Sequence, residues 1–93
     1  MPLTMSTERE TALQFPCDFP LKVMGEAIAD FDALVAAIVL KHVSALREGA
    51  VRSRASRGGK YVSVTVTIQA ESREQLDDLY RELSAHERVL MVL

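Results

Sequence analysis

Residues 62–69 alternate between apolar side chains and hydroxyl or amide side chains without interruption. A period of two, built on β-branched residues, is typical of a strand with one buried face. The pattern cannot be read as a helix, so it rules out an all-helical bundle, which was the alternative architecture for a chain of 93 residues. The residues that we expect to face the core are Val62, Val64, Val66 and Ile68.

Three further strands are predicted, at residues 21–24, 51–56 and 89–93. We expect Gly25 to end the first of them, because glycine permits the turn that must follow. The second strand should be a half-exposed edge strand, and Gly58-Gly59 should form the two-residue turn that leads from it into the alternating strand. The last strand is apolar on both faces, which is unusual at the edge of a sheet.

Two helices are predicted between these strands. The first runs from Asp30 or Asp32 to about residue 46, where Gly49 should cap its end. The second starts with the capping-box pair Ser72 and Gln75. Its apolar positions follow at helical spacing, and they are Leu76, Leu79, Tyr80 and Leu83.

The order strand, helix, strand, strand, helix, strand predicts an α+β ferredoxin-like βαββαβ sandwich. Right-handed crossovers place both helices on one face of a four-stranded antiparallel sheet, with the first and third strands in the middle. A chain of this length supports one modest core. We therefore expect a single domain over residues 13–93, preceded by a mobile N-terminal tail over residues 1–12.

The residues that could carry catalysis or bind a metal are few. Cys17 is the only cysteine, and His42 and His86 are the only histidines. Neither a nucleophile beside a base nor a metal-ligand spacing is present, so we expect no enzyme, no cofactor and no metal site. The longest apolar run, residues 33–40, is too short to cross a bilayer, so we expect no membrane span. The single cysteine cannot form an intramolecular disulfide, so we expect a protein of the reducing cytoplasm.

Basic residues are concentrated in one part of a chain whose net charge is −2. Residues 47–60 contain five basic residues and one acidic residue, Glu48. Their placement around the predicted hairpin suggests a surface that binds an anion, a phosphate or an acidic partner, although charged edge strands also serve only to prevent aggregation. The low aromatic content argues against nucleic acid. The candidate surface consists of Gly25, Arg52, Arg54, Arg57 and Lys60.

Four segments together resemble the YbeD-like family of small bacterial proteins of unassigned function. They are FPCDFPLKVMG at residues 15–25, SRGGKYVSVTV at residues 56–66, LYxxL at residues 79–83 and the terminal MVL at residues 91–93. The resemblance implies a fold similar to that of ACT regulatory domains, which bind small effectors, often amino acids, where two domains meet. It implies no catalytic residue. ACT domains typically turn from the first strand into the first helix through a Pro-Gly pair, which this chain lacks at residues 25–28.

Self-association is predicted from the last strand, because only one face of a helix-backed sheet reaches the core. One set of its apolar side chains must therefore look outward, where Met24 of the first strand also lies. We expect a homodimer through a surface that contains Met24, Leu90 and Val92. Our leading hypothesis is a small regulatory or interaction domain, and the alternative is a module whose basic hairpin docks on an acidic protein or nucleic acid.

Overall fold

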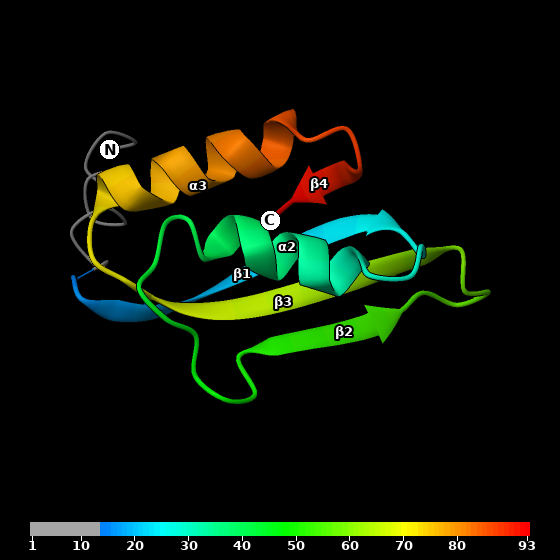
Figure 1. Cartoon of the computed structure of the whole chain (residues 1–93), viewed down its shortest axis with the longest axis horizontal. Coiled ribbons are helices and arrows are strands. Elements are labelled where there is room, and N and C mark those ends of the chain that lie inside the picture. Colours follow the sequence, from blue (N-terminus) through cyan, green and yellow to red (C-terminus); the bar gives the residue numbers. More distant parts are fainter. Residues whose placement is uncertain (1–13) are drawn as a thin grey trace, which may run out of the picture.

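The computed structural model describes residues 14–93, so the predicted tail over residues 1–12 lies outside the described residues. The elements follow the predicted order (Figure 1). Within the described part of the chain, no helix is long and apolar enough to span a membrane. The elements are β1 (Cys17–Glu26), α2 (Phe31–Val39), β2 (Val51–Ala55), β3 (Tyr61–Ala70), α3 (Arg73–Ala85) and β4 (Val89–Val92).

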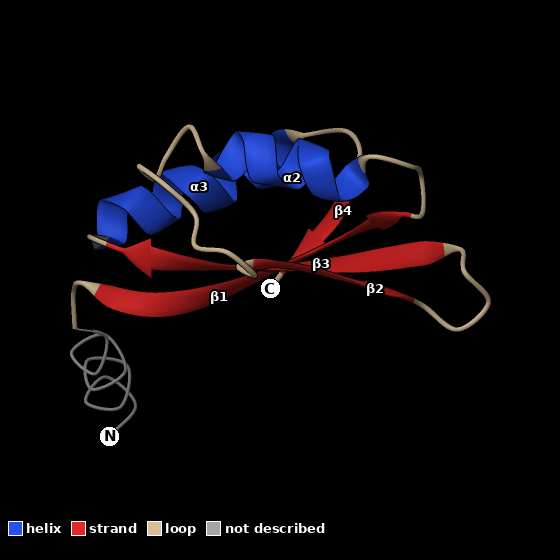
Figure 2. Cartoon of the chain, turned by 60° about the horizontal axis from the view of Figure 1, so that its bottom comes forward, coloured by secondary structure: helices blue, strands red, loops and turns tan. Residues whose placement is uncertain are grey.

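The four strands form one antiparallel sheet in the order β2-β3-β1-β4. Both helices cover the same face of this sheet, and its other face carries neither of them (Figure 2). The predicted ferredoxin-like architecture is thus confirmed, including the two central strands. We call the face without helices the open face.

The core lies between the sheet and the two helices. The alternating residues of β3 point as predicted, because Val64, Val66 and Ile68 are buried while Thr67 and Gln69 are exposed. Each fully buried large apolar side chain stabilises the fold by about 1.5–3 kcal/mol. The other fully buried large side chains are Leu21, Val23, Phe31, Val35, Val39, Leu79 and Leu83.

Helix α3 begins as its sequence predicts. The Ser72 hydroxyl accepts a hydrogen bond from the Gln75 N–H at 3.1 Å, and the Gln75 side-chain oxygen accepts one from the Glu71 N–H at 2.7 Å. These bonds satisfy two backbone N–H groups at the start of the helix. The Gln75 side chain also donates to the His42 carbonyl at 2.8 Å, which joins α3 to the segment after α2.

Helix α2 is shorter than predicted, since it ends at Val39 instead of continuing to about residue 46. The Lys41 and His42 N–H groups bond to carbonyls three residues back, at 3.1 and 2.9 Å, so the chain tightens and leaves the helix. The Val43 side chain is thereby buried in the core. Gly49 does not cap this helix, but lies at φ +79° in a later turn.

The N-terminus of α2 follows Asp30, one of the two predicted starting residues. Asp30 occupies the cap position with φ 74°, yet its side chain makes no capping hydrogen bond. Its carboxylate instead contacts the Arg88 guanidinium at 3.2 Å. This ion pair ties the start of α2 to the segment that precedes β4.

A second link joins the segment after α2 to α3. The Glu82 carboxylate pairs with the Lys41 ammonium and lies 2.7 Å from the His42 ring nitrogen Nε2. The hydrogen bond from Lys41, and then that from His42, lowers the pKa of Glu82 below its usual value. The helix layer is therefore held together by polar bonds as well as by packing.

Gly25 does not end the first strand, although we predicted from the sequence that it would. β1 continues through Gly25 to Glu26, and Gly25 is buried beneath Phe31. A Cβ atom here would lie 2.6 Å from Phe31 Cε1 and 2.8 Å from the Arg88 carbonyl oxygen. Glycine is needed at this position for close approach rather than for a turn.

Candidate functional site

The basic hairpin, which we define as Arg52, Arg54, Arg57 and Lys60, presents four exposed cations. Arg52 lies opposite Thr65 in the β2–β3 ladder, and Arg54 lies opposite Ser63. Both arginines therefore extend from the open face, since Val64 and Val66 point to the helices. Within residues 14–93, no salt bridge involves any of the four cations.

The tip of the hairpin is positioned by backbone bonds. Gly58 and Gly59 both have positive φ, as predicted, but the loop between β2 and β3 spans residues 56–60 rather than two residues. The Ser56 N–H donates to the Tyr61 carbonyl at 2.8 Å and closes this loop. The Lys60 carbonyl accepts a hydrogen bond from the Ala27 N–H at 2.9 Å, which attaches the tip to the segment between β1 and α2.

A fifth cation, Lys22, belongs to the same surface. Lys22 lies opposite Thr65, so the Thr65 hydroxyl stands in the row between Lys22 and Arg52. Two cations with a hydroxyl between them can hold a carboxylate or phosphate by charge-assisted hydrogen bonds. The sequence prediction omitted Lys22 from the site, although the alternation of residues 21–24 places it on the outer face.

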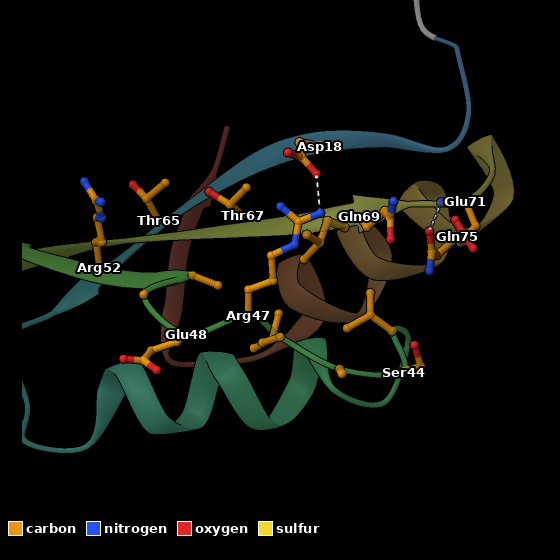
Figure 3. Close-up of a pocket in the computed structure, with 16 residues that line it drawn as sticks. Asp18, Ser44, Arg47, Glu48, Arg52, Thr65, Thr67, Gln69, Glu71 and Gln75 are labelled. Carbon is orange, nitrogen blue, oxygen red and sulfur yellow. Dashed lines mark hydrogen bonds and ion pairs between the residues drawn. The ribbon is translucent and has the colours of Figure 1, made fainter.

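A cavity of about 540 Å³ adjoins the hairpin, and we call it the edge cavity (Figure 3). It exists because β2 pairs with β3 only as far as Val66, whereas β3 continues to Ala70. The Thr67 N–H donates to the Ala50 carbonyl at 2.9 Å, and the chain before Ala50 turns away from the sheet. The polar side chains around the cavity include Asp18, Arg47, Arg52, Thr65, Thr67, Gln69, Glu71 and Gln75.

Arg47 extends across the edge cavity toward Asp18 (Figure 3). Its Nη2 atom lies 3.5 Å from Asp18 Oδ1, and both side chains are more than half exposed. An exposed pair of this kind contributes little stability, about 0–1 kcal/mol, so an incoming anion can compete with Asp18 for Arg47. Arg47 and Arg52 both line the cavity, which gives it two guanidinium groups. Gly25, which we predicted to belong to this surface, is buried elsewhere.

The apolar side chains of the opposite edge lie differently from the prediction in one respect. Met24 is opposite Met91 on the open face, but Val92 is opposite Val23 and packs against the core. The cause is a β-bulge between Met24 and Gly25 that places Leu90 as an extra residue of β4. Of the three residues predicted for self-association, Met24 and Leu90 therefore lie outside the core, whereas Val92 does not. Met91 and Leu93 are exposed at this edge instead.

The potentially reactive side chains are engaged in packing and local bonds. Cys17 is half-buried and packs against the core. His42 contacts Glu82, and the His86 ring nitrogen Nδ1 accepts a hydrogen bond from the Arg88 N–H at 3.1 Å. Among residues 14–93, no three histidine, cysteine or acidic side chains gather closely enough to hold a metal ion.

Comparison with known proteins gives a family and close relatives. Residues 10–93 match the family described as "Protein of unknown function (DUF493)". A UPF0250 protein of Paraburkholderia phytofirmans is 43% identical over 89 residues, which cover 96% of this chain and all of that protein. A UPF0250 protein of Janthinobacterium sp. is 46% identical over 84 residues, which cover 90% of this chain and 92% of that protein. The resemblance found in the sequence is confirmed by these matches.

Proposed function

This chain belongs to the DUF493 family, and from its geometry we propose that it is a non-catalytic interaction domain that docks an acidic protein segment on its basic hairpin. The observation that carries the proposal is the row formed by Lys22, Thr65 and Arg52 on the open face. The neighbouring Arg54 extends from the same face. No carboxylate of residues 14–93 forms a salt bridge with these cations, so their charge is available to a partner.

The residue types favour carboxylates as the bound groups. A guanidinium group binds a carboxylate through two parallel hydrogen bonds, and threonine and serine hydroxyls can donate a further bond beside it. The patch crosses three neighbouring strands spaced about 4.8 Å apart, which suits a short acidic segment. A long polyanion such as nucleic acid matches it less well, because the chain as a whole carries a net charge of −2 and Tyr61 is the aromatic side chain nearest the hairpin.

Binding of a small-molecule effector is a second candidate, and the edge cavity is the observation that favours it. Its volume of about 540 Å³ falls within the range of about 300–1,000 Å³ that is common for ligand sites. Arg47 and Arg52 would hold the anionic group of such an effector. Isothermal titration with inorganic phosphate and with dicarboxylates separates this candidate from docking of a protein segment.

The docking proposal is tested with a fluorescent decaglutamate peptide at low ionic strength. We expect the double variant Arg52→Gln/Arg54→Gln to raise the Kd about threefold to thirtyfold, because each of the two exposed charges contributes up to about 1 kcal/mol. The matched control is Arg73→Gln/Arg81→Gln on α3, which removes the same charge from the helix side and should change the Kd less than twofold. Added salt should weaken wild-type binding.

Two results would overturn the docking proposal. One is that the wild-type protein does not retain the peptide even at low ionic strength. The other is that the control variant weakens binding as much as the hairpin variant does, since attraction would then depend on overall charge alone. A ten-nucleotide single-stranded DNA serves as a second probe, and tighter binding of DNA than of peptide would favour nucleic acid as the partner.

A further inference from the structure

β4 is an edge strand whose outer side is unpaired. It pairs with β1 on its inner side, and no strand of residues 14–93 lies beyond it. The Leu93 N–H donates to the Lys22 carbonyl at 2.8 Å, and the Lys22 N–H donates to the Leu93 carbonyl at 3.2 Å. Because backbone groups alternate in direction along a strand, the N–H and C=O groups of Val92 point away from β1. This edge can therefore accept another strand.

The side chains at this edge are apolar and exposed. Leu90 is 57% exposed, Met91 is 50% exposed and Leu93 is 59% exposed. Residues 89–93 contain neither a charged residue nor a proline, which are the usual means of keeping an edge strand from pairing. The bulge at Leu90 is another such means, but it leaves residues 91–93 in regular register with β1.

We propose that residues 91–93 of two copies of this chain pair antiparallel across a two-fold axis at Val92, so that the two sheets become continuous. The Val92 N–H and C=O groups of each copy would bond reciprocally to those of the other. Met91 of each copy would face Leu93 of the other on the open face, with Met24 beside them. The same apolar surface serves both copies, as a two-fold interface requires.

Charge distribution favours a second copy at β4 rather than at β2. With strands about 4.8 Å apart, pairing at β4 leaves the two Lys22 side chains about 14 Å apart, beyond the Debye length of about 8 Å. Pairing of two β2 strands would instead bring Arg52 and Arg54 of both copies into adjacent strands. Like charges so placed destabilise a sheet.

The proposed pairing also places the basic hairpins. An axis perpendicular to the sheet keeps both open faces on the same side of the dimer. The two β2 strands would then lie at the outer ends of the continuous sheet, about 34 Å apart. A partner with two acidic segments could bind both ends and gain from their combined affinity.

Sedimentation equilibrium of the full chain, from micromolar to millimolar concentration, tests the pairing. We expect the wild type to dimerise. Val92→Pro removes an N–H that points outward and leaves the bonds to β1 in place, so it should weaken dimerisation at least tenfold. The matched control is Ser53→Pro, which removes an outward N–H from β2 and should leave dimerisation unchanged.

A second variant keeps the test open if Val92→Pro does not fold. Met91→Lys changes an exposed side chain, so it should preserve the fold while also weakening dimerisation at least tenfold. Circular dichroism checks the fold of each variant. A wild type that stays monomeric at about 1 mM would overturn the proposal, since the Kd would then be higher than that of specific interfaces. So would a dimer that is insensitive to both variants of β4, or equally sensitive to Ser53→Pro.

Discussion

The two edge strands of one sheet are built in opposite ways. β2 presents Arg52 and Arg54 on the open face, and four of its five residues are exposed. β4 presents Leu90 and Met91, and it contains no charged residue. Among residues 14–93, no further strand pairs with the outer edge of either one, so the backbone does not distinguish them. The difference lies in the side chains, which disfavour pairing at β2 and, under our proposal, allow it at β4.

The two edges also differ in how they are joined to the rest of the domain. The segment before β4 is held by Arg88, whose guanidinium lies 5.8 Å from the centre of the Phe31 ring and 3.2 Å from the Asp30 carboxylate. Gly25 allows this close packing. The end of β2 continues into an exposed loop that touches the β1–α2 segment through one backbone bond from Ala27 to Lys60. An apolar edge that is anchored to the core suits a stable interface, and an exposed basic hairpin suits transient binding of a partner.

The largest expected effect comes from a change beneath the β4 edge. Gly25→Ala forces Phe31 and the Arg88 backbone to move, so we expect it to destabilise the protein by about 3 kcal/mol. Gly59→Ala at the hairpin tip is the comparison, because a Cβ there meets no atom within 4 Å and only the positive φ of 70° is unfavourable. Its cost should be about 1 kcal/mol. Urea unfolding measures the free energy of unfolding of both variants. Equal losses of stability would contradict the difference in how the two edges are anchored.

A second prediction concerns a variant in which the charged β2 edge becomes apolar, like the edge at β4. Arg52→Ile/Arg54→Ile removes the charges that we hold responsible for keeping β2 unpaired, while isoleucine suits a strand. We expect the fold to persist and the protein to form assemblies larger than a dimer, because two edges can then pair. Light scattering measures the mass. An unchanged mass at high concentration would show that charge does not protect this edge.

The smallest effect is expected in the helix layer, away from both edges. Glu82 has a lowered pKa in the folded protein, so its stabilising contribution is present above its unfolded pKa of about 4.3 and is lost as the pH falls through the folded pKa. Glu82→Gln should therefore reduce stability at neutral pH and match the wild type in strong acid. Urea unfolding at both pH values measures this. A difference in stability that is the same at both pH values would contradict the role of the charge. Peptide binding and dimerisation should not change in this variant.

Much of the fold could be predicted from local patterns. The alternation of β3, the capping box of α3 and the order of the elements are properties of neighbouring residues, and the structure confirms them. The end of α2 could not be predicted, because it depends on burial of Val43 and on the bond between Gln75 and the His42 carbonyl. Contacts of this kind join residues that are distant in the sequence.

The candidate surfaces show the same division. The sequence correctly predicted that Arg52 and Arg54 extend from the same face of β2, since side chains alternate between the two faces of a strand. The orientation of Val92 was predicted wrongly, because in a strand that is apolar on both faces the sequence does not indicate which residues face inward. The bulge at Leu90 also shifts the register. The edge cavity was missed as well. It results from the different lengths of β2 and β3, which only the pairing reveals.

The measurement that tests the difference between the two edges most directly is amide hydrogen exchange at low and at high protein concentration. The amides of Val92 and Ser53 both point outward, one from β4 and one from β2. We predict that exchange at Val92 slows as the concentration rises, because pairing with a second copy protects it, while exchange at Ser53 does not change. Exchange at Val92 that is independent of concentration, or protection that appears at Ser53 instead, would contradict the account.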